Sequence, residues 1–494
     1  MRKPGFIAAG HETTADTAAG VLRVGGNAFD AAAAALATTF VTEPCMSSPG
    51  GGGFATYRLA NGKVGVLDFF CQTPQNKILN TDPDFYPITV NFGDTTEDFY
   101  VGLASMAVPG CLAGLTELHR LGRMPFSELL QPAIAQAKEG VPVNAFQRLD
   151  FELLRDILHK DPAARDIFFK AGERLIELGE LLRMPRMASF LDFVARDGIG
   201  EFYRGEIAAR LEETCSDNGG FLTRADLAGY RVHHRRPLHY AYGTHCIITN
   251  PTPSMGGSLL ALGLQHLTEH AHYSGTHIDR MQHLLAELSF MSRDPETLRY
   301  RLCNPAVPKL DNSSRGGTTH FSIVDGQGNA VAVTVSNGEG SGYLLPGTDV
   351  MMNNMLGETA LLPMGHHTWD LDVRLSSMMS PTIVTDEQHE LTAVCGTGGA
   401  GRIPTAILQV LHYYLDRGKP LHEAVHAPRA FVGHDTLYFE PGFEAAPTAI
   451  DGLSQQPFAE SSLFFGGVHS VARTGDTYTA VGDARRHGVA RRVE

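Results

Sequence analysis

The chain has 494 residues, of which 43% are hydrophobic and 19% are charged, so it can bury a large core and an intrinsically disordered chain is excluded. Its 40 basic and 54 acidic side chains leave a formal net charge of −14, which gives no electrostatic reason to bind nucleic acid or an acidic membrane surface. We therefore expect a small-molecule partner, no nucleic acid and no membrane.

The cysteines and histidines give no sign of a metal or redox site. Seven scattered cysteines without C-x-x-C spacing indicate neither a disulfide framework nor a zinc site, and the 22 histidines are dispersed. We expect no metal and no cofactor. Residues 1–6 contain two basic side chains but no apolar segment like that of a signal peptide, which predicts a cytoplasmic protein.

The first predicted elements are two alanine-rich helices, at residues 11–22 and 27–41. The second opens with Asn27 and has Asp30 three residues later, which is close to a capping box. It ends before Pro44. The chain therefore begins with a compact pair of helices.

A glycine run at residues 50–53 follows and leads into two strands, 55–59 and 64–69. A glycine run can hold a phosphate, but no Gly-Lys-Ser/Thr follows and the run does not open a helix after a strand. Close packing of backbone against backbone is the stronger interpretation.

The middle of the chain has mostly helical spacing. It runs from residue 109 to 231, and resumes at 258–267 and 277–290. The segment 305–317 is polar and carries no apolar pattern, so we expect an exposed connector. We therefore expect this part of the chain to form a helical outer layer.

Beyond residue 317 the pattern changes to the alternation of strands. Residues 318–324 and 330–336 alternate, with turn residues between them, and predict an antiparallel hairpin. If the hairpin is symmetric about Gln327, Thr318 lies opposite Ser336. Two hydroxyl groups then become neighbours at the open end of the hairpin.

The junction between the polar connector and the first strand of the hairpin, at Gly317 and Thr318, can support nucleophilic catalysis. The sequence contains neither the G-x-S-x-G motif of Ser-His-Asp hydrolases nor the H-E-x-x-H motif, so these two standard kinds of hydrolase are not indicated. If the bond between Gly317 and Thr318 were cut, the new α-amino group, with a pKa of roughly 7.7–8.0, would be a base on the same residue as the hydroxyl it activates. The Thr318 hydroxyl can make the cut itself by attacking the Gly317 carbonyl, giving an ester that water hydrolyses. A Thr-Thr pair alone would more often reflect only β-propensity.

Residues 317–334 resemble the start of the small subunit in the γ-glutamyltranspeptidase family, whose members are N-terminal-nucleophile (Ntn) hydrolases. Other segments resemble the family's motifs in the same order along the chain. They are Gly50–Phe54, Val108–Gly110, Pro253–Gly257, Arg374–Val384, Gly396–Ile403 and Ala427–Arg429. The resemblance implies an α+β fold, a four-layer αββα sandwich of the Ntn-hydrolase type.

The resemblance also implies self-cleavage between Gly317 and Thr318. The products are a large (α) segment, 1–317, and a small (β) segment, 318–494, which stay associated as one intertwined structural domain, a heterodimer. The sequence leaves open whether two heterodimers associate further.

Site residues follow from the same matches. Thr318 is the expected nucleophile, and Ser336 replaces a family threonine whose hydroxyl contacts it. The backbone N–H groups of Gly399 and Ala400 are the expected oxyanion hole. The expected substrate-binding residues are Phe70, Asn337, Met355, Glu358, Ser376 and Ser377.

The chain departs from the family at two of these positions. Phe70 stands where the family has an arginine that clamps a substrate carboxylate, and a buried carboxylate left without it would cost about 3–5 kcal/mol. Met355 replaces a polar residue. Both changes predict an acyl group less zwitterionic than γ-glutamyl, although Glu358 still favours an amino head. The short stretch between Glu358 and Arg374 predicts an open pocket that admits larger amides, and favours hydrolysis over transfer.

These observations predict a self-processing Ntn-type threonine amidohydrolase or acyltransferase that hydrolyses a small-molecule amide through an acyl-Thr318 intermediate. Two alternatives stay open at this point. One is a genuine γ-glutamyltransferase or glutathione hydrolase with a different carboxylate clamp. The other is an uncleaved, non-catalytic relative that only binds its ligand.

Overall fold

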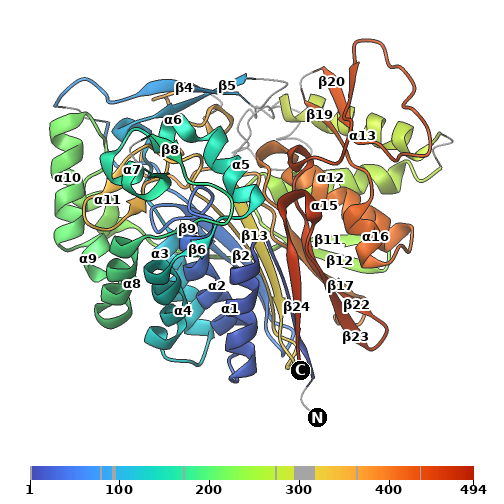
Figure 1. Ribbon diagram of the computed structural model, residues 1–494. Helices are drawn as coiled ribbons and strands as arrows, with labels where there is room; N and C mark the ends of the chain where they lie inside the picture. The colour runs from blue at the N-terminus through green and yellow to red at the C-terminus, as the bar shows by residue number, and fades with distance from the viewer. Residues whose placement is uncertain are drawn as a thin grey trace.

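Two β-sheets lie face to face, and helices cover the outer face of each (Figure 1). The computed structural model describes residues 3–77, 80–91, 96–170, 173–272, 275–293, 317–362, 365–433 and 435–494. The expected connector at 305–317 lies outside the described residues except for Gly317. Within the described ranges, no helix has the length and apolarity needed to span a bilayer. The four layers confirm the predicted αββα sandwich.

The first sheet has seven antiparallel strands. In spatial order they are β10 (His233–Arg235), β3 (Val64–Phe69), β2 (Gly52–Arg58), β14 (Ala330–Ser336), β13 (Thr318–Val324), β1 (Gly5–Ala9) and β24 (Val489–Val493). Strands from the two halves of the chain therefore alternate in one sheet, with β14 and β13 between β2 and β1.

The second sheet has six antiparallel strands. They are β11 (Leu238–Tyr242), β12 (His245–Thr249), β17 (Thr382–Asp386), β18 (Leu391–Gly396), β22 (His469–Thr474) and β23 (Thr477–Val481). A small apolar cluster that includes Ala332, Ile383 and Val394 fills the space between the two sheets. Alternating side chains on both facing surfaces make this interior.

Each sheet has its own helical cover (Figure 1). On the first sheet lie α1 (Glu12–Arg23), α2 (Ala28–Thr42), α3 (Cys111–Leu121), α4 (Phe126–Glu139) and α8 (Pro185–Asp197). Around them are α5 (Ala145–Leu153), α6 (Arg155–Leu158), α7 (Pro162–Phe168), α9 (Gly200–Tyr203), α10 (Glu206–Asn218) and α11 (Arg224–Gly229). On the second sheet lie α12 (Gly256–Glu269), α13 (His277–Arg293), α15 (Ile403–Leu411) and α16 (Leu421–His426).

Several small sheets made of short strands lie outside the two main sheets. They pair as β4 (Tyr86–Asn91) with β5 (Thr96–Val101), β6 (Val141–Pro142) with β9 (Leu181–Leu182), β7 (Phe169–Lys170) with β8 (Arg174–Leu175), and β15 (Leu344–Leu345) with β16 (Val350–Met351). A three-stranded sheet contains β19 (Ala430–Gly433), β20 (Thr436–Phe439) and β21 (Ser454–Pro457).

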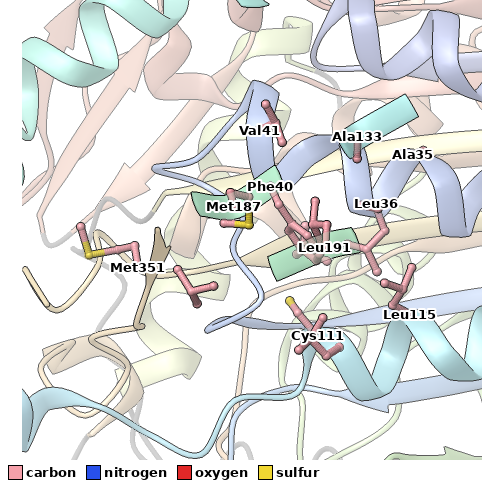
Figure 2. Packing of buried hydrophobic residues seen from close by; sticks show 14 of the residues in the cluster. Ala35, Leu36, Phe40, Val41, Cys111, Leu115, Ala133, Met187, Leu191 and Met351 are labelled. Carbon is pink, nitrogen blue, oxygen red and sulfur yellow. The ribbon is translucent and has the colours of Figure 1, made fainter. Parts of the chain in front are cut away.

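Helix α2 is buried along its whole length and forms the floor beneath the strands β13 and β14. The predicted capping box is present, because Asn27 accepts from the Asp30 N–H while Asp30 accepts from the Asn27 N–H. Alanine makes the burial possible, since its small side chain lets neighbouring helices approach closely. Figure 2 shows Leu36 and Phe40 of α2 gathered with apolar residues of α3 and α8.

The glycine run packs backbone against backbone, as the sequence favours. A Cβ atom on Gly51 would lie 2.5 Å from the Ser336 carbonyl oxygen, and one on Gly52 would lie 2.7 Å from the Cys71 nitrogen. Strand β2 begins inside the run and pairs Gly52 with Ser336. The protein's own backbone fills the space a phosphate would need, so the phosphate interpretation is wrong. Predicted helices and strands otherwise agree with the structure to within a few residues.

We predict that Gly53→Ala destabilises the fold, because a Cβ there would lie 2.5 Å from the Thr334 carbonyl oxygen and 2.8 Å from the Phe69 ring. Overpacking of this kind costs about 1–3 kcal/mol. Gly20→Ala in α1 is the matched control, since its Cβ meets nothing within 4 Å and alanine stabilises a helix by about 0.5–1 kcal/mol. Urea denaturation of both variants measures the two effects, and shifts of the same sign would refute this interpretation of the glycine run.

Candidate active site

The hairpin register places Thr318 directly opposite Ser336. All seven residue pairs from Thr318–Ser336 to Val324–Ala330 are in register, which confirms the symmetric hairpin predicted from the sequence. Both end residues are buried, with 4% and 5% of their surface exposed. Strand β13 pairs along its whole length with β14 and, from Phe321 to Val324, also with β1, so the strand that carries Thr318 lies inside the sheet and Thr318 itself is paired with β14.

The peptide bond between Gly317 and Thr318 is held at three points. The Ser336 hydroxyl donates to the Gly317 carbonyl oxygen at 2.7 Å and accepts from the Gly338 N–H at 3.0 Å. Glu339 accepts from the Gly317 N–H at 3.1 Å. Arg486 Nη1 donates to the Thr318 carbonyl oxygen at 3.1 Å. A hydroxyl donor on the Gly317 carbonyl polarises that group toward attack.

The loop before α15 closes over Thr318. Gly398 lies so close that a Cβ on it would be 2.0 Å from the Thr318 carbonyl oxygen. Within the described residues, no backbone–backbone hydrogen bond donated by the N–H groups of Gly399 or Ala400 is present. Ala400 has a φ of +47°, in the left-handed region, where a non-glycine residue costs about 1–2 kcal/mol. The loop therefore tolerates alanine at a glycine-like position, at a cost in strain.

A cavity of about 40 Å³ lies next to Thr318. Its walls bring together eight of the residues that the sequence predicts for the site. They are Thr318, Ser336, Ala400, Phe70, Met355, Glu358, Ser376 and Ser377. Leu361, Met378, Met379, Gly401 and Ile403 complete the lining. Since one water needs about 10–15 Å³ of such volume, the cavity has room for a short chemical group.

The loop at residues 253–257 supports one wall of this cavity. The Ser254 hydroxyl donates to the Ser377 carbonyl oxygen at 2.9 Å, and the Ser376 hydroxyl donates to the Pro253 carbonyl oxygen at 2.8 Å. A Cβ on Gly256 would lie 2.0 Å from the Met378 carbonyl oxygen. The motif Arg374–Val384 therefore forms a wall of the cavity, and the motif Pro253–Gly257 supports that wall from behind.

The part of the lining that contains Phe70 is apolar, and Arg374 beside it is bound to other partners. The Phe70 ring is buried and stacks on Phe54 with ring centroids 5.5 Å apart. Arg374 lies behind Phe70, where it donates to the Phe70 carbonyl oxygen, to the Tyr230 hydroxyl at 2.6 Å and to the Arg231 carbonyl oxygen at 2.6 Å. Glu358 is the one charged residue among the described residues that line the cavity.

Two predicted site residues do not reach the cavity. Asn337 is fully buried, and its amide donates to the Met351 carbonyl oxygen at 3.4 Å. Because neighbouring residues of a strand point to opposite faces, Ser336 faces the cavity and Asn337 faces away from it. Gly399 is not among the lining residues, and a Cβ on it would lie 3.4 Å from the Gly466 Cα. The structure gives no support to substrate binding by Asn337.

The described part of the short stretch between Glu358 and Arg374 packs against the body of the protein. Leu361 lines the cavity. Trp369 packs edge-on against Phe221 with ring centroids 5.5 Å apart, and His366 lies 4.2 Å from the Tyr100 ring centroid. These contacts hold the described part of the segment against the body of the protein.

Three residues that the sequence does not single out surround the nucleophile. Arg486 contacts the Thr318 carbonyl, and on the other face of β13 the Thr319 hydroxyl donates to Glu43 at 2.6 Å. Burial raises the pKa of Glu43 from 4.5 to about 7. No local motif marks these residues, because Glu43 and Arg486 come from distant parts of the chain. Cys71 is a buried thiol whose pKa burial raises, so it is not a reactive group.

Comparison with known proteins gives a consistent result. A family profile described as "Gamma-glutamyltranspeptidase" matches residues 14–299 and 292–493. A "Glutathione hydrolase proenzyme" from Pseudomonas aeruginosa is 31% identical over 98% of this chain and 94% of its own length. An "Acylase ACY 1 proenzyme" from Pseudomonas sp. strain SE83 is 30% identical over 90% of this chain and 85% of its own length.

Among solved structures, the cephalosporin acylase from Bacillus halodurans superposes with a TM-score of 0.79. It is 23% identical, and the match covers 99% of this chain and 96% of that one. At this level of identity the superposition supports the fold.

We predict that Glu43 makes stability depend on pH. Its raised pKa means that the folded protein binds an extra proton between about pH 4.5 and 7, so this contribution to stability falls as the pH rises through that range. Glu43→Gln keeps an acceptor for Thr319 and removes the titration. Relative to this variant, the wild type should lose about 3 kcal/mol between pH 5 and pH 8 in denaturant unfolding. A stability difference that stays the same at both pH values would show that Glu43 is not held protonated by burial.

Proposed function

The chain belongs to the gamma-glutamyltranspeptidase family and is an enzyme, and from this premise we propose that it is a self-processing amidohydrolase with Thr318 as nucleophile. The observation that carries the proposal is the registered pair of Thr318 and Ser336, with the Ser336 hydroxyl on the Gly317 carbonyl and a cavity beside Thr318. These groups are positioned for acyl transfer to the Thr318 hydroxyl.

The first reaction is self-cleavage. The Thr318 Oγ attacks the Gly317 carbonyl carbon, the C–N bond breaks, and the Gly317 acyl group moves from nitrogen to oxygen. Water then hydrolyses the ester, leaving a carboxylate on Gly317 and a free α-amino group on Thr318. The Ser336 hydroxyl, 2.7 Å from the Gly317 oxygen, stabilises the negative charge that develops there.

The second reaction repeats this chemistry on a substrate. The α-amino group of Thr318 takes the hydroxyl proton, and Oγ attacks the amide carbonyl. The N–H groups of Gly399 and Ala400 stabilise the oxyanion. The α-ammonium group returns the proton to the leaving amine, which departs. Water, activated by the same amino group, hydrolyses the acyl-Thr318 ester and restores the hydroxyl.

The cavity chemistry favours a short acyl group that carries no carboxylate. Phe70 and Met355 are apolar, and among the described lining residues neither an arginine nor a lysine is present. Glu358 would repel a carboxylate and attract an amino group. The relatives named as acylases support this preference for an amide other than γ-glutamyl.

The two alternatives left open by the sequence fit less well. A glutathione hydrolase with another carboxylate clamp would need a cation in the cavity, but Arg374 is engaged by the Phe70, Tyr230 and Arg231 oxygen atoms. A non-catalytic binding protein is disfavoured, because relatives across the whole length of the chain are named as enzymes.

The two cleaved segments should remain together. Strands β13 and β14 of the small segment pair with β1 and β2 of the large segment, so separation would break ladders on both sides. Because mass scales with length, the 53.4 kDa chain gives fragments of about 34 and about 19 kDa.

We predict that Thr318→Ala abolishes both self-cleavage and amide hydrolysis, because it removes the attacking oxygen of both reactions. Thr318→Ser keeps that oxygen and should restore both in part. A denaturing gel and an amidase assay measure the two outcomes, and circular dichroism checks that the alanine variant is folded. Two fragments in a folded Thr318→Ala protein would show that another agent cuts the chain.

We predict that Phe70→Arg shifts acyl preference toward substrates with a carboxylate. A hydrogen bond to a charged group contributes about 1.5–3 kcal/mol, so the ratio of kcat/KM for a γ-glutamyl anilide over a butanoyl anilide should rise about 10- to 100-fold. Phe70→Leu, which stays apolar, is the control and should leave the ratio unchanged. An unchanged ratio in processed, folded Phe70→Arg would mean that position 70 does not contact the acyl group.

A further inference from the structure

The proposed mechanism fixes where the leaving amine must lie. The proton that this amine receives comes from the α-amino group of Thr318, so the two nitrogen atoms must come within about 3 Å of each other. In the intact chain this position next to the Thr318 nitrogen is occupied by Gly317. The space around Gly317 is therefore the space that the leaving amine enters after cleavage.

The cavity of about 40 Å³ next to Thr318 is called the acyl cavity below, because we propose that it holds the acyl group. Gly317 does not line the acyl cavity but lines a second cavity. This second cavity has a volume of about 190 Å³, compared with about 40 Å³ for the acyl cavity. The two share no lining residue, and they meet where Gly317 joins Thr318 and where Gly401 joins Arg402. A substrate that spans the nucleophile would thus place one part in each cavity.

Apolar side chains make most of the wall of the larger cavity. Phe146 and Leu149 come from α5, which lies close to the end of β13 in Figure 1. Phe458 and Phe464 face them and stack with ring centroids 5.3 Å apart. Leu149 is 43% exposed although it is a large hydrophobic residue, so the cavity leaves apolar surface in contact with water. Covering such surface with an apolar ligand is favourable.

Polar groups stand at the inner end of this cavity, close to the nucleophile. Asp150 and Arg486 belong to the lining, and Arg486 is the residue that donates to the Thr318 carbonyl. Arg402 and Ser462 add polar groups beside Phe464, and apolar side chains supply most of the rest of the wall along which the body of the amine would extend.

We propose that the cavity lined by Phe146, Leu149, Phe458 and Phe464 binds the leaving amine, and that the substrate is an amide between a short acyl group and a larger, apolar primary amine of about the size of a benzyl group. The proposal rests on the proposed amidohydrolase function and adds the substrate class.

The test compares two amides with the same acyl group, N-benzylpropanamide and N-methylpropanamide, using the processed enzyme. Amine release gives kcat/KM for each. Leu149→Glu places a charge in the apolar wall, and Phe458→Ala removes one face of it. Each variant should lower the ratio of the benzyl to the methyl substrate by about tenfold, because the methylamide does not reach the altered wall. Dividing by the wild-type ratio removes the intrinsic reactivity of the two amides.

Leu178→Glu is the matched control, since Leu178 is 63% exposed and lies outside the lining of both cavities. It should leave the ratio unchanged. A proportional loss for both amides in Leu149→Glu and Phe458→Ala, or no loss for either, would overturn the assignment of the cavity while leaving the amidohydrolase intact. Failure of the proposed function looks different, because the wild-type chain would stay in one piece and cut neither amide.

Discussion

The structure depends on one register, that of the hairpin formed by β13 and β14. It puts Thr318 opposite Ser336, and Ser336 in turn places its hydroxyl on the Gly317 carbonyl at 2.7 Å. A slip of one residue would turn every side chain of the strand to the other face. The buried helix α2 and the neighbouring strands β1 and β2 pack against the hairpin and prevent that slip. The packing of the core therefore fixes the position of Thr318.

Around that fixed nucleophile, charge and volume divide the site into two unlike halves. The proposed acyl side is small, Glu358 is the one charged residue among its described lining residues, and Phe70 stands at the position for which the resemblance implies an arginine. Arg374 stays behind this wall, held by backbone and hydroxyl oxygen atoms. The proposed amine side is larger and mostly apolar, with Asp150, Glu339, Arg402, Ser462 and Arg486 as its polar lining residues. The substrate preference that we propose follows from this difference between the two cavities.

The parts predictable from the sequence are those with local signals. The hairpin is predicted by the alternation of its strands and the turn between them. Most of the expected residues that line the acyl cavity are predicted by short motifs, each of which can be recognised on its own. Asn337, an expected substrate-binding residue, is absent from the cavity lining, and no local pattern in the sequence shows that the strand ends at Ser336. Glu43 and Arg486 approach Thr318 from far along the chain and carry no pattern. No spacing in the sequence reveals that Leu361 lines the cavity or that Trp369 packs against Phe221.

The central claim is that one residue, Thr318, becomes a chain terminus and carries the acyl group. The most direct measurement is peptide mapping by mass spectrometry after the enzyme reacts with an amide and is quenched in acid. The account predicts an acyl adduct on the first residue of a peptide that begins with Thr318-Thr319-His320. An adduct on any other residue, or a labelled peptide in which Gly317 is still joined to Thr318, would contradict it.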